Sequence, residues 1–274
     1  MRKIGCCTWI FNNEPLEVTT QRLHQCGLHG AELHGDINRI NPVQAGQLFS
    51  DKGLEIFSIT PGDADIAHPD RKIRQEGLTY YEKLIEWVLK LDQKLTAPII
   101  SCHGLVQRIR PISTQEEEND LLVDSTQKIC EMAKSASLNI VFEILNRYES
   151  HQIRTVTEGL DFLKRVNAPN LKLLPDAYHM NIEEANPAEA LRLGHHHIGL
   201  YHAADSNRGA IGEGHTDFAA QFGALNDIQY SGPIILEVAA PGPDPFNTNK
   251  GEGFKEVLQK QLVKSVQAIR ALGS

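Results

Sequence analysis

Short apolar runs recur along the chain and alternate with longer stretches in which apolar and polar residues mix. Most of the short runs are apolar throughout, as in PIISC, LNIVF and PIILEV, which is typical of parallel strands covered on both faces. The predicted strands are residues 4–9, 30–34, 54–59, 98–102, 138–143, 171–176, 197–203 and 233–238. Eight strands that alternate with helices predict an α/β protein, either a closed (β/α)8 TIM barrel or a long doubly wound sheet.

The stretches between the strands repeat their apolar residues every three or four positions, as amphipathic helices do. The two clearest repeats are Tyr81, Leu84, Ile85, Val88, Leu91 and Leu95, and Leu258, Leu262, Val266 and Ile269. Residues 113–116 have the spacing of a capping box. We interpret the run Glu116-Glu117-Glu118 as the acidic first turn of the next helix, where the helix dipole favours carboxylates.

The turn after the first predicted strand decides between the two folds. A doubly wound sheet that binds a nucleotide needs a glycine-rich turn there, and residues 8–13 contain no glycine. The chain also has no Pro/Ser-rich linker or low-complexity tract that would mark a second domain. We therefore predict a single TIM barrel over residues 1–274.

Composition narrows the class of protein further. The 27 Lys and Arg residues against 35 Asp and Glu residues give a net charge of −8, which disfavours a protein that binds nucleic acid or an anionic membrane. No apolar run approaches the roughly 20 residues that span a bilayer, and the first residues do not resemble a signal peptide. The five cysteines include no CxxC pair, which favours free thiols in a reducing compartment. We predict a cytoplasmic protein.

Four polar residues close four consecutive predicted strands: Glu143, Asp176, His202 and Glu237. They lie 33, 26 and 35 residues apart, and each interval is about one βα unit. Because the active site of a TIM barrel lies at the carboxyl ends of its strands, these side chains are expected to converge on one point. Singly, each could be a helix cap, an ion-pair partner or a hydrogen-bonded core residue.

Three carboxylates that converge repel one another unless a positive charge joins them. A divalent cation supplies that charge, and oxygen ligands with a single imidazole favour Mn²⁺, Mg²⁺ or Co²⁺ over structural zinc. His179 follows Asp176 by three residues, and Arg208 follows His202 in a glycine-containing loop. Both are candidate donors to an oxyanion, although His179 could instead orient a ligand and Arg208 could form a rim ion pair.

The segments VFEILNRYE, DAYHMNIEE, YHAADSNRGAIGEGHTDF and ILEV resemble the sugar isomerase/epimerase family with a xylose-isomerase-like barrel, and most of all its ketose 3-epimerases of the D-tagatose and D-psicose type. The resemblance covers residues 140–238. It implies that Glu143, Asp176, His202 and Glu237 bind one metal ion, commonly Mn²⁺. It also implies that the family's substrate is a small-molecule sugar and that the chain forms a dimer or tetramer.

The resemblance further implies the roles of single residues. Glu143 and Glu237 would be the acid/base pair on opposite faces of the substrate carbon. His179 and Arg208 would contact the carbonyl oxygen, and Glu149 would bind a terminal hydroxyl. One glutamate would remove the proton next to the ketone and the other would return a proton on the opposite face, through a cis-enediolate, which inverts the centre.

Two departures from these epimerases leave the substrate open. In these epimerases the second residue after the last metal-binding glutamate is usually aromatic, whereas this chain has Ala239. A tryptophan of the substrate pocket is also common after the fourth strand, where this chain has residues 103–106 (HGLV). Trp9, Phe11 and Phe246 are candidates to replace that apolar wall. The alternative function is therefore a metal-dependent isomerase, dehydratase or lyase that acts on an inosose or a 3-dehydro-glycoside.

Two other classes of protein use such a barrel. An apurinic endonuclease of the endonuclease IV type would hold three zinc ions with additional histidines, and His34 and His103 are the candidates for those. The residues that complete its pattern are missing, because the third strand ends Ser58-Ile59-Thr60 and no Asp-x-His pair follows His202. A sugar-binding barrel would not need two opposed carboxylates. The run His195-His196-His197 is interpreted as part of the rim or as support for the ligands.

Overall fold

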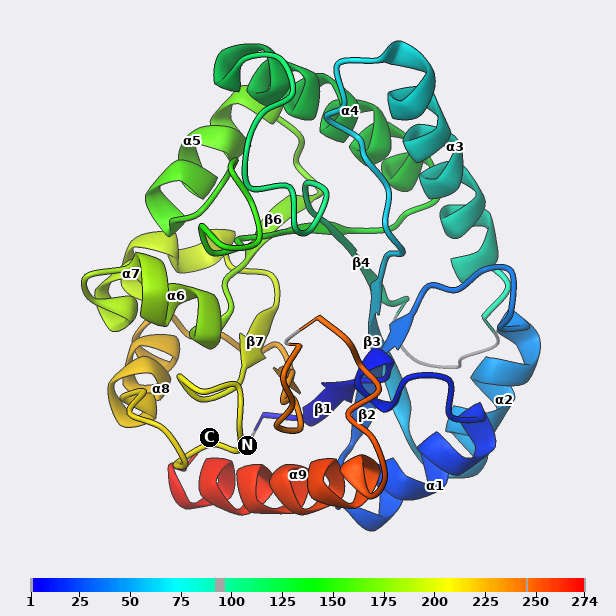
Figure 1. Cartoon of the computed structure of the whole chain (residues 1–274), viewed down its shortest axis with the longest axis vertical. Coiled ribbons are helices and arrows are strands. Elements are labelled where there is room, and N and C mark those ends of the chain that lie inside the picture. Colours follow the sequence, from blue (N-terminus) through cyan, green and yellow to red (C-terminus); the bar gives the residue numbers. More distant parts are fainter. Residues whose placement is uncertain (1, 92–96, 245, 274) are drawn as a thin grey trace.

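The computed structural model describes residues 2–91, 97–244 and 246–273. Eight strands pair in parallel in the order β6-β5-β4-β3-β2-β1-β8-β7 and curve round a common axis (Figure 1). The strands are β1 (Ile4–Cys7), β2 (Gly30–His34), β3 (Glu55–Thr60), β4 (Ile99–Cys102), β5 (Ile140–Glu143), β6 (Leu171–Leu174), β7 (Tyr201–Ala203) and β8 (Ile234–Leu236). The prediction of an α/β (β/α)8 barrel is confirmed.

The barrel closes between β6 and β7 through few backbone contacts. In the described part of the chain, only two isolated bridges, Leu173 with Ile198 and Asp176 with His202, join this side of the barrel. The His202 N–H donates to the Pro175 carbonyl across 3.1 Å. This junction is therefore held by less strand pairing than the other junctions of the barrel.

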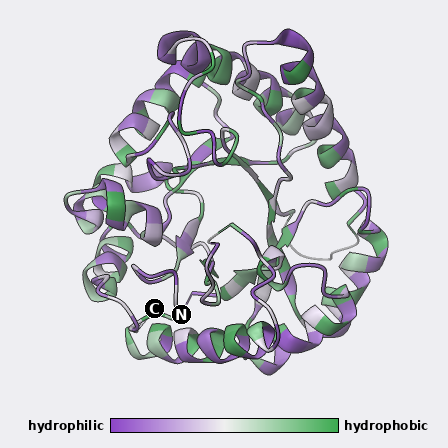
Figure 2. Ribbon diagram, viewed as in Figure 1, coloured by the Kyte–Doolittle hydropathy of each residue, from purple (hydrophilic) through white to green (hydrophobic). Residues whose placement is uncertain are grey.

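Helices follow the strands and surround the barrel. They are α1 (Leu16–Gln25), α2 (Pro42–Asp51), α3 (Arg71–Val88), α4 (Gln115–Ser135), α5 (Val156–Val166), α6 (Ala177–Glu183), α7 (Pro187–Gly194), α8 (Phe218–Asp227) and α9 (Phe254–Ala271), with 3-10 turns η1 (Trp9–Phe11) and η2 (His195–His197). Figure 2 shows hydrophobic and hydrophilic residues alternating along these helices, as expected for helices with one face against the strands.

The predicted helix repeats match the buried faces of α3 and α9. Tyr81, Leu84 and Val88 on α3 are buried, as are Leu258, Leu262, Val266 and Ile269 on α9. Each such side chain that leaves water contributes about 1.5–3 kcal/mol to folding. Leu91 is buried beyond the end of α3, and Leu95 lies outside the described residues.

Of two local interpretations at the start of α4, the capping box is wrong and the acidic first turn is confirmed. Thr114, not Ser113, caps α4, since its hydroxyl accepts from the Glu117 N–H across 3.1 Å. Glu116, Glu117 and Glu118 do form the acidic first turn of α4. Glu118 is also completely buried, and its carboxylate pairs with Arg108 and His151 and accepts from the backbone N–H groups of Ile112 and Ser113.

The three consecutive histidines do not begin a strand. They form the turn η2, which ends four residues before β7 and precedes its amino end. They therefore lie at the end of the barrel opposite the strand termini where Glu143 and Glu237 are found, which corrects the interpretation of this run as rim or ligand support.

The sequence also predicted free thiols and no membrane-spanning segment. All five cysteines are buried and free. Among the described residues, no helix has both the length and the apolar character needed to cross a membrane.

Candidate active site

Glu143, Asp176, His202 and Glu237 come together at the carboxyl ends of neighbouring strands. Glu143 is the last residue of β5, and Glu237 directly follows β8. His202 is the middle residue of β7. Asp176 lies two residues beyond β6 and caps α6, since its Oδ1 accepts from the backbone N–H of His179 across 2.9 Å. The one-per-strand spacing in the sequence thus corresponds to one cluster in space.

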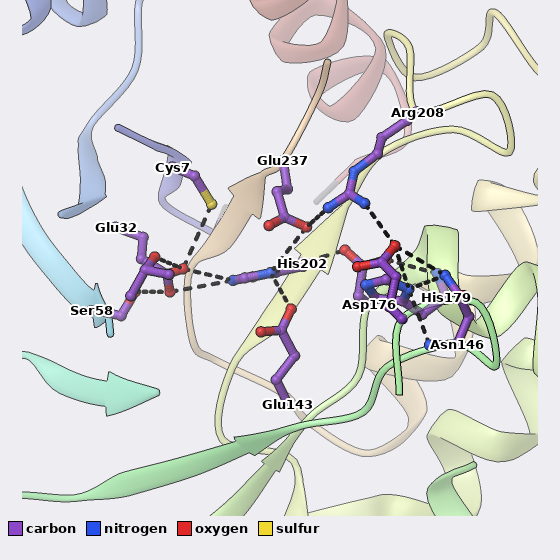
Figure 3. A network of polar contacts seen from close by, with 12 residues as sticks. Cys7, Glu32, Ser58, Glu143, Asn146, Asp176, His179, His202, Arg208 and Glu237 are labelled. Atoms are coloured by element: carbon purple, nitrogen blue, oxygen red, sulfur yellow. Dashed lines mark hydrogen bonds and ion pairs between the residues drawn. The ribbon is translucent and has the colours of Figure 1, made fainter. Parts of the chain in front are cut away.

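The imidazole of His202 lies at the centre of this cluster (Figure 3). Its Nδ1 is 3.4 Å from Glu143 Oε1, 3.6 Å from Glu237 Oε2 and 3.9 Å from Asp176 Oδ2. Ligand atoms of Glu143, His202 and Glu237 lie within 4.8 Å of one another, and so do those of Asp176, His179 and Glu237. All of these side chains are buried.

Two atoms of the cluster are buried without a hydrogen-bond partner among the described residues. They are Asp176 Oδ2 and His202 Nδ1, and an unpaired buried polar atom is costly for a folded chain. Both face a cluster rich in carboxylate oxygens, which hard and borderline divalent cations prefer. The residues present therefore fit a site for one divalent ion.

The pKa values of Asp176 and Glu237 are shifted in opposite directions. Burial and the charge of Glu237 raise the pKa of Asp176 to about 7. Burial also raises the pKa of Glu237, but Arg208 and His202 outweigh it and hold that pKa far below its usual value. The two carboxyl groups thus differ in charge state near neutral pH, as expected for buried like charges.

Arg208 joins the cluster to Glu149. Its Nη2 donates to Glu237 Oε2 across 2.8 Å, and its Nη1 donates to Glu149 Oε1 across 3.3 Å. The guanidinium carbon lies 4.8 Å from the centre of the Tyr178 ring, where the π face favours a cation. Burial raises the pKa of Glu149, although Arg208 opposes the shift.

The loop that carries Arg208 is organised by Asp205, which the sequence analysis did not identify. The Asp205 carboxylate accepts from the backbone N–H groups of Ser206, Gly212 and Thr216 at 2.7–3.0 Å. Arg208 itself has a φ of 59°, a conformation that costs free energy for a side chain other than glycine. Its N–H donates to the Asp205 carbonyl across 2.7 Å, so the turn holds Arg208 in this conformation.

His179 packs beside the cluster with one ring nitrogen occupied. Asn146 Nδ2 lies 2.7 Å from His179 Nδ1, and Asn146 Oδ1 accepts from the Tyr148 N–H. That second bond orients the amide so that its NH₂ group donates to Nδ1. Burial, and then Arg208, lower the pKa of His179 to about 3. The ring is therefore neutral, with its proton on Nε2, which is buried and has no hydrogen-bond partner among the described residues.

A cavity of about 650 Å³ lies over the cluster. It is lined by Glu143, Glu149, His179, Arg208 and Glu237. It is also lined by polar residues of the loops after β1, β2 and β3, among them Asn12, Asn13, Asp36, Arg39 and Asp63, and by Gln44 of α2. Of the three aromatic candidates, Trp9 and Phe246 line the cavity, whereas Phe11 is completely buried in the core.

The extra histidines considered for a nuclease do not join the cluster. His34 and His103 line the cavity, but in the described part of the chain neither belongs to a group of side chains placed to hold a metal ion. His103 Nδ1 lies 2.6 Å from the Gly104 carbonyl instead. The structure thus offers one compact cluster rather than three zinc sites.

The sequence analysis also missed Glu32, which lies on the other side of the His202 ring from Glu143, Asp176 and Glu237 (Figure 3). Its carboxylate is completely buried, and His202 Nε2 lies 3.2 Å from it. The only signal was a lone glutamate in the apolar segment GAELH. That pattern does not distinguish a side chain inside the barrel from one between the strands and the helices.

Comparisons with known proteins agree with this architecture. The family model of the xylose isomerase-like TIM barrel matches residues 20–261. An L-ribulose 3-epimerase of Mesorhizobium japonicum is 34% identical over 186 residues, which are 68% of this chain but only 61% of that protein. A 3-dehydro-D-guloside 4-epimerase of Escherichia coli is 26% identical over 249 residues, covering 89% of this chain and 94% of that protein.

A similar fold is found among solved structures. The D-psicose 3-epimerase of Clostridium cellulolyticum, solved with D-tagatose, superposes with a TM-score of 0.88. The two chains are 21% identical, and the match covers 98% of this chain and 99% of the other. Since the family model spans most of the sequence and the barrel is the same, the chain belongs to the xylose isomerase-like TIM barrel family.

Proposed function

We propose that this chain is a metal-dependent epimerase that inverts C3 of a ketose or keto-sugar. The observation that carries the proposal is the placement of Glu143 and Glu237. Both carboxylates are buried, and they approach His202 Nδ1 from opposite sides at 3.4 and 3.6 Å (Figure 3). An inversion needs one group to remove a proton from one face of the carbon and another to deliver a proton to the opposite face.

The metal ion would be held by Glu143, Asp176, His202 and Glu237. Mn²⁺ suits this set of three carboxylates and one imidazole best, and Mg²⁺ or Co²⁺ would also fit. When bound, a divalent ion polarises the carbonyl group and stabilises the negative charge that develops on oxygen as the neighbouring proton leaves.

The side chains of this protein would perform the proton transfers. One of the two glutamates accepts the proton from C3, and the electron pair of the C–H bond forms a C2=C3 double bond. The C2 oxygen then carries the negative charge of an enediolate. The other glutamate donates a proton to C3 from the opposite face, which restores the ketone with the inverted configuration.

His179 and Arg208 would stabilise the charge on the C2 oxygen. The neutral His179 ring presents its Nε2–H towards the site because Nδ1 accepts from Asn146. Arg208 presents fixed cationic donors and lies between Glu237 and Glu149. Donors that are held in place before the reaction stabilise developing charge without reorganisation. Glu149 would accept a hydrogen bond from a hydroxyl group at the far end of the substrate.

Exchange of substrate protons with solvent tests the proposal. The protein is incubated in D₂O with Mn²⁺ and separately with ketohexoses, ketopentoses and 3-dehydro-glycosides, and NMR follows deuterium at each carbon. We expect deuterium at C3 together with the C3 epimer, and neither after EDTA treatment. A nuclease or a sugar-binding protein incorporates no deuterium, so its absence with every sugar would refute the proposal.

A second candidate is an isomerase, dehydratase or lyase that acts on a cyclic keto-sugar such as an inosose or a 3-dehydro-glycoside. The 650 Å³ cavity favours it, because polar side chains of the loops after β1, β2 and β3 line it in addition to the residues around His202. The small Ala239 side chain also lines this cavity. Deuterium incorporation and product formation with 3-dehydro-glycosides, and none with free ketoses, would favour this candidate.

The setting of the reaction follows from the sequence. We propose a cytoplasmic enzyme that assembles as a dimer or tetramer and acts on a small sugar, not on nucleic acid or at a membrane. Light scattering of the purified protein measures the assembly, and localisation of a fluorescent fusion tests the compartment.

A further inference from the structure

We propose that Glu32 is a positioning residue for the metal site, and this proposal rests on the proposed function. Its carboxylate accepts the Nε2–H of His202 and thereby leaves Nδ1 of the same ring unprotonated and directed at Glu143, Asp176 and Glu237. Glu32 would act through His202 alone, since it does not line the cavity where a sugar binds.

The environment of Glu32 is that of a carboxylate held in one orientation. Ser58 Oγ donates to Oε2 across 2.6 Å, and Thr60 Oγ1 donates to Oε1 across 2.5 Å. Cys7 Sγ lies 3.6 Å from Oε1. His202 Nε2 lies 3.2 Å from both carboxylate oxygens. A completely buried carboxylate needs such donors to remain ionised. These four come from β1, β3 and β7, and Figure 3 shows Cys7, Ser58 and His202 around Glu32.

The pairing of β2 with β3 places Ser58 opposite Glu32. Ala31 pairs with Ile56, whereas Glu32 pairs with Ser58, so the register shifts by one residue at Phe57. Such bulges redirect side chains and are frequent beside functional sites. Gly30 permits the close approach of the two strands, because a Cβ atom there would lie 2.1 Å from the Glu55 carbonyl oxygen.

The chemistry of imidazole links Glu32 to the ion. A ring that binds an ion through one nitrogen is neutral and carries its single proton on the other nitrogen, which here is Nε2, facing the acceptor Glu32. The lone pair of Nδ1 then faces the buried carboxylates, where Nδ1 has no hydrogen-bond partner among the described residues. Metal-binding histidines commonly donate their second N–H to a carboxylate, which fixes the ring and strengthens its basicity.

The test compares Glu32→Gln with Glu118→Gln. Glu118 is an equally buried carboxylate, paired with Arg108 and His151 away from His202, so the same substitution there controls for the loss of a buried charge. Calorimetry measures Mn²⁺ binding without any sugar. We expect Glu32→Gln to weaken Mn²⁺ binding about 10- to 100-fold and Glu118→Gln to leave it within about twofold. Equal affinity in both variants would overturn the proposal.

NMR of the Mg²⁺-loaded protein gives an independent readout. We expect the ring of His202 to carry its proton on Nε2 in the wild type, with the downfield shift of a hydrogen-bonded proton, and that shift to be lost in Glu32→Leu, which cannot accept a hydrogen bond. Circular dichroism checks that both variants are folded. A proton on Nδ1 in the wild type would overturn the proposal.

The stoichiometry of binding separates the proposal from its main competitor. Ligand atoms of Cys7, Glu32 and His202 lie within 4.8 Å of one another, so Glu32 could itself be a ligand of a second ion. One Mn²⁺ per chain in the wild type supports the positioning role, and two ions that fall to one in Glu32→Gln would overturn it. Weakened Mn²⁺ binding in Glu32→Gln without turnover of any sugar would support this inference while contradicting the proposed function.

Discussion

Arg208 Nη2 donates a hydrogen bond to Glu237 Oε2 across 2.8 Å. The residue proposed to bind the substrate oxygen thus also contacts one of the two proposed acid/base groups. Together with His202, Arg208 outweighs the effect of burial and holds the pKa of Glu237 far below its usual value. Glu237 is therefore ionised before substrate binds, which is the form that can accept a proton.

Replacing Glu237 by glutamine should abolish turnover. The amide can neither accept the substrate proton nor return it, and the loss of such a group typically costs 10²–10⁴-fold in rate. We expect at least about a 10³-fold lower kcat, since an ion ligand is lost as well, with an unchanged circular dichroism spectrum. Glu189→Gln, on the exposed surface of α7, is the matched control. Turnover near the wild-type rate would contradict both roles of Glu237.

Replacing His179 by alanine should separate catalysis from metal binding. Removing one donor to an oxyanion typically lowers kcat by about 10²–10³-fold, and we expect kcat/KM to fall within that range. Mn²⁺ affinity, measured by calorimetry, should change far less, because the Nε2 atom of His179 carries a proton. A large loss of affinity would instead place His179 among the ligands, which its proximity to Asp176 and Glu237 permits.

Replacing Asp205 by asparagine should weaken substrate binding, because the turn that Asp205 organises holds Arg208. In the wild type, Gly212 donates to Oδ2, and Ser206 and Thr216 donate to Oδ1. The NH₂ group of the asparagine would replace one of these oxygens, so a donor would face a backbone N–H donor. Hydrogen bonds to a charged group contribute about 1.5–3 kcal/mol each. We expect a higher KM and lower stability with unchanged Mn²⁺ affinity. An unchanged KM would contradict the role of this turn in holding Arg208.

The same residue predicts how stability depends on pH. Burial raises the pKa of Asp205, but the backbone N–H groups of Gly214, Thr216 and Ser206 outweigh it and leave the folded pKa below the unfolded value. The stabilisation is then complete above about pH 4 and is lost as the pH falls through the folded pKa. Urea unfolding between about pH 5 and pH 3 should show the wild type converging towards Asp205→Asn. If the free energies of unfolding of the two proteins stayed equally far apart over this pH range, the lowered pKa of Asp205 would be contradicted.

Removing the metal ion should stop the reaction but leave the barrel folded. After EDTA treatment, Mn²⁺ at 100 times its dissociation constant should restore activity and add about 2.7 kcal/mol to the free energy of unfolding. For a chain of this size that raises Tm by roughly 5–10 °C, which calorimetry measures. Ca²⁺ serves as the control ion, because it prefers longer bonds and more ligands. Full activity in EDTA would contradict a metal-dependent reaction.

The sequence predicted the barrel well because its signals are local. Each apolar run became a strand, although β7 begins at Tyr201 and the preceding histidines form a separate turn. The four residues around the proposed ion were also predictable, since each stands at or near a strand end and the strands follow one another in the barrel. Periodicity along the chain was sufficient for both.

The supporting residues could not be predicted in the same way. Glu32 acts through a contact with His202, which lies 170 positions away in the chain. Asp205 holds Arg208 through a local turn, which has no periodic pattern. The placement of Ser58 opposite Glu32 depends on a shift of register between two strands, which no local pattern displays. The burial of Glu118 was not predicted for a similar reason, since its ion-pair partners Arg108 and His151 belong to other loops.

The sparse pairing of β6 with β7 has a consequence for local opening. Asp176 and His202 face each other across that junction, so an ion held by both would join strands that share few backbone contacts. Amide hydrogen exchange at Gly199 and His202, whose N–H groups donate across the junction, would then slow when Mn²⁺ is added, and the amides between β1 and β2 would not respond. Closure of the barrel and assembly of its catalytic centre would be one event.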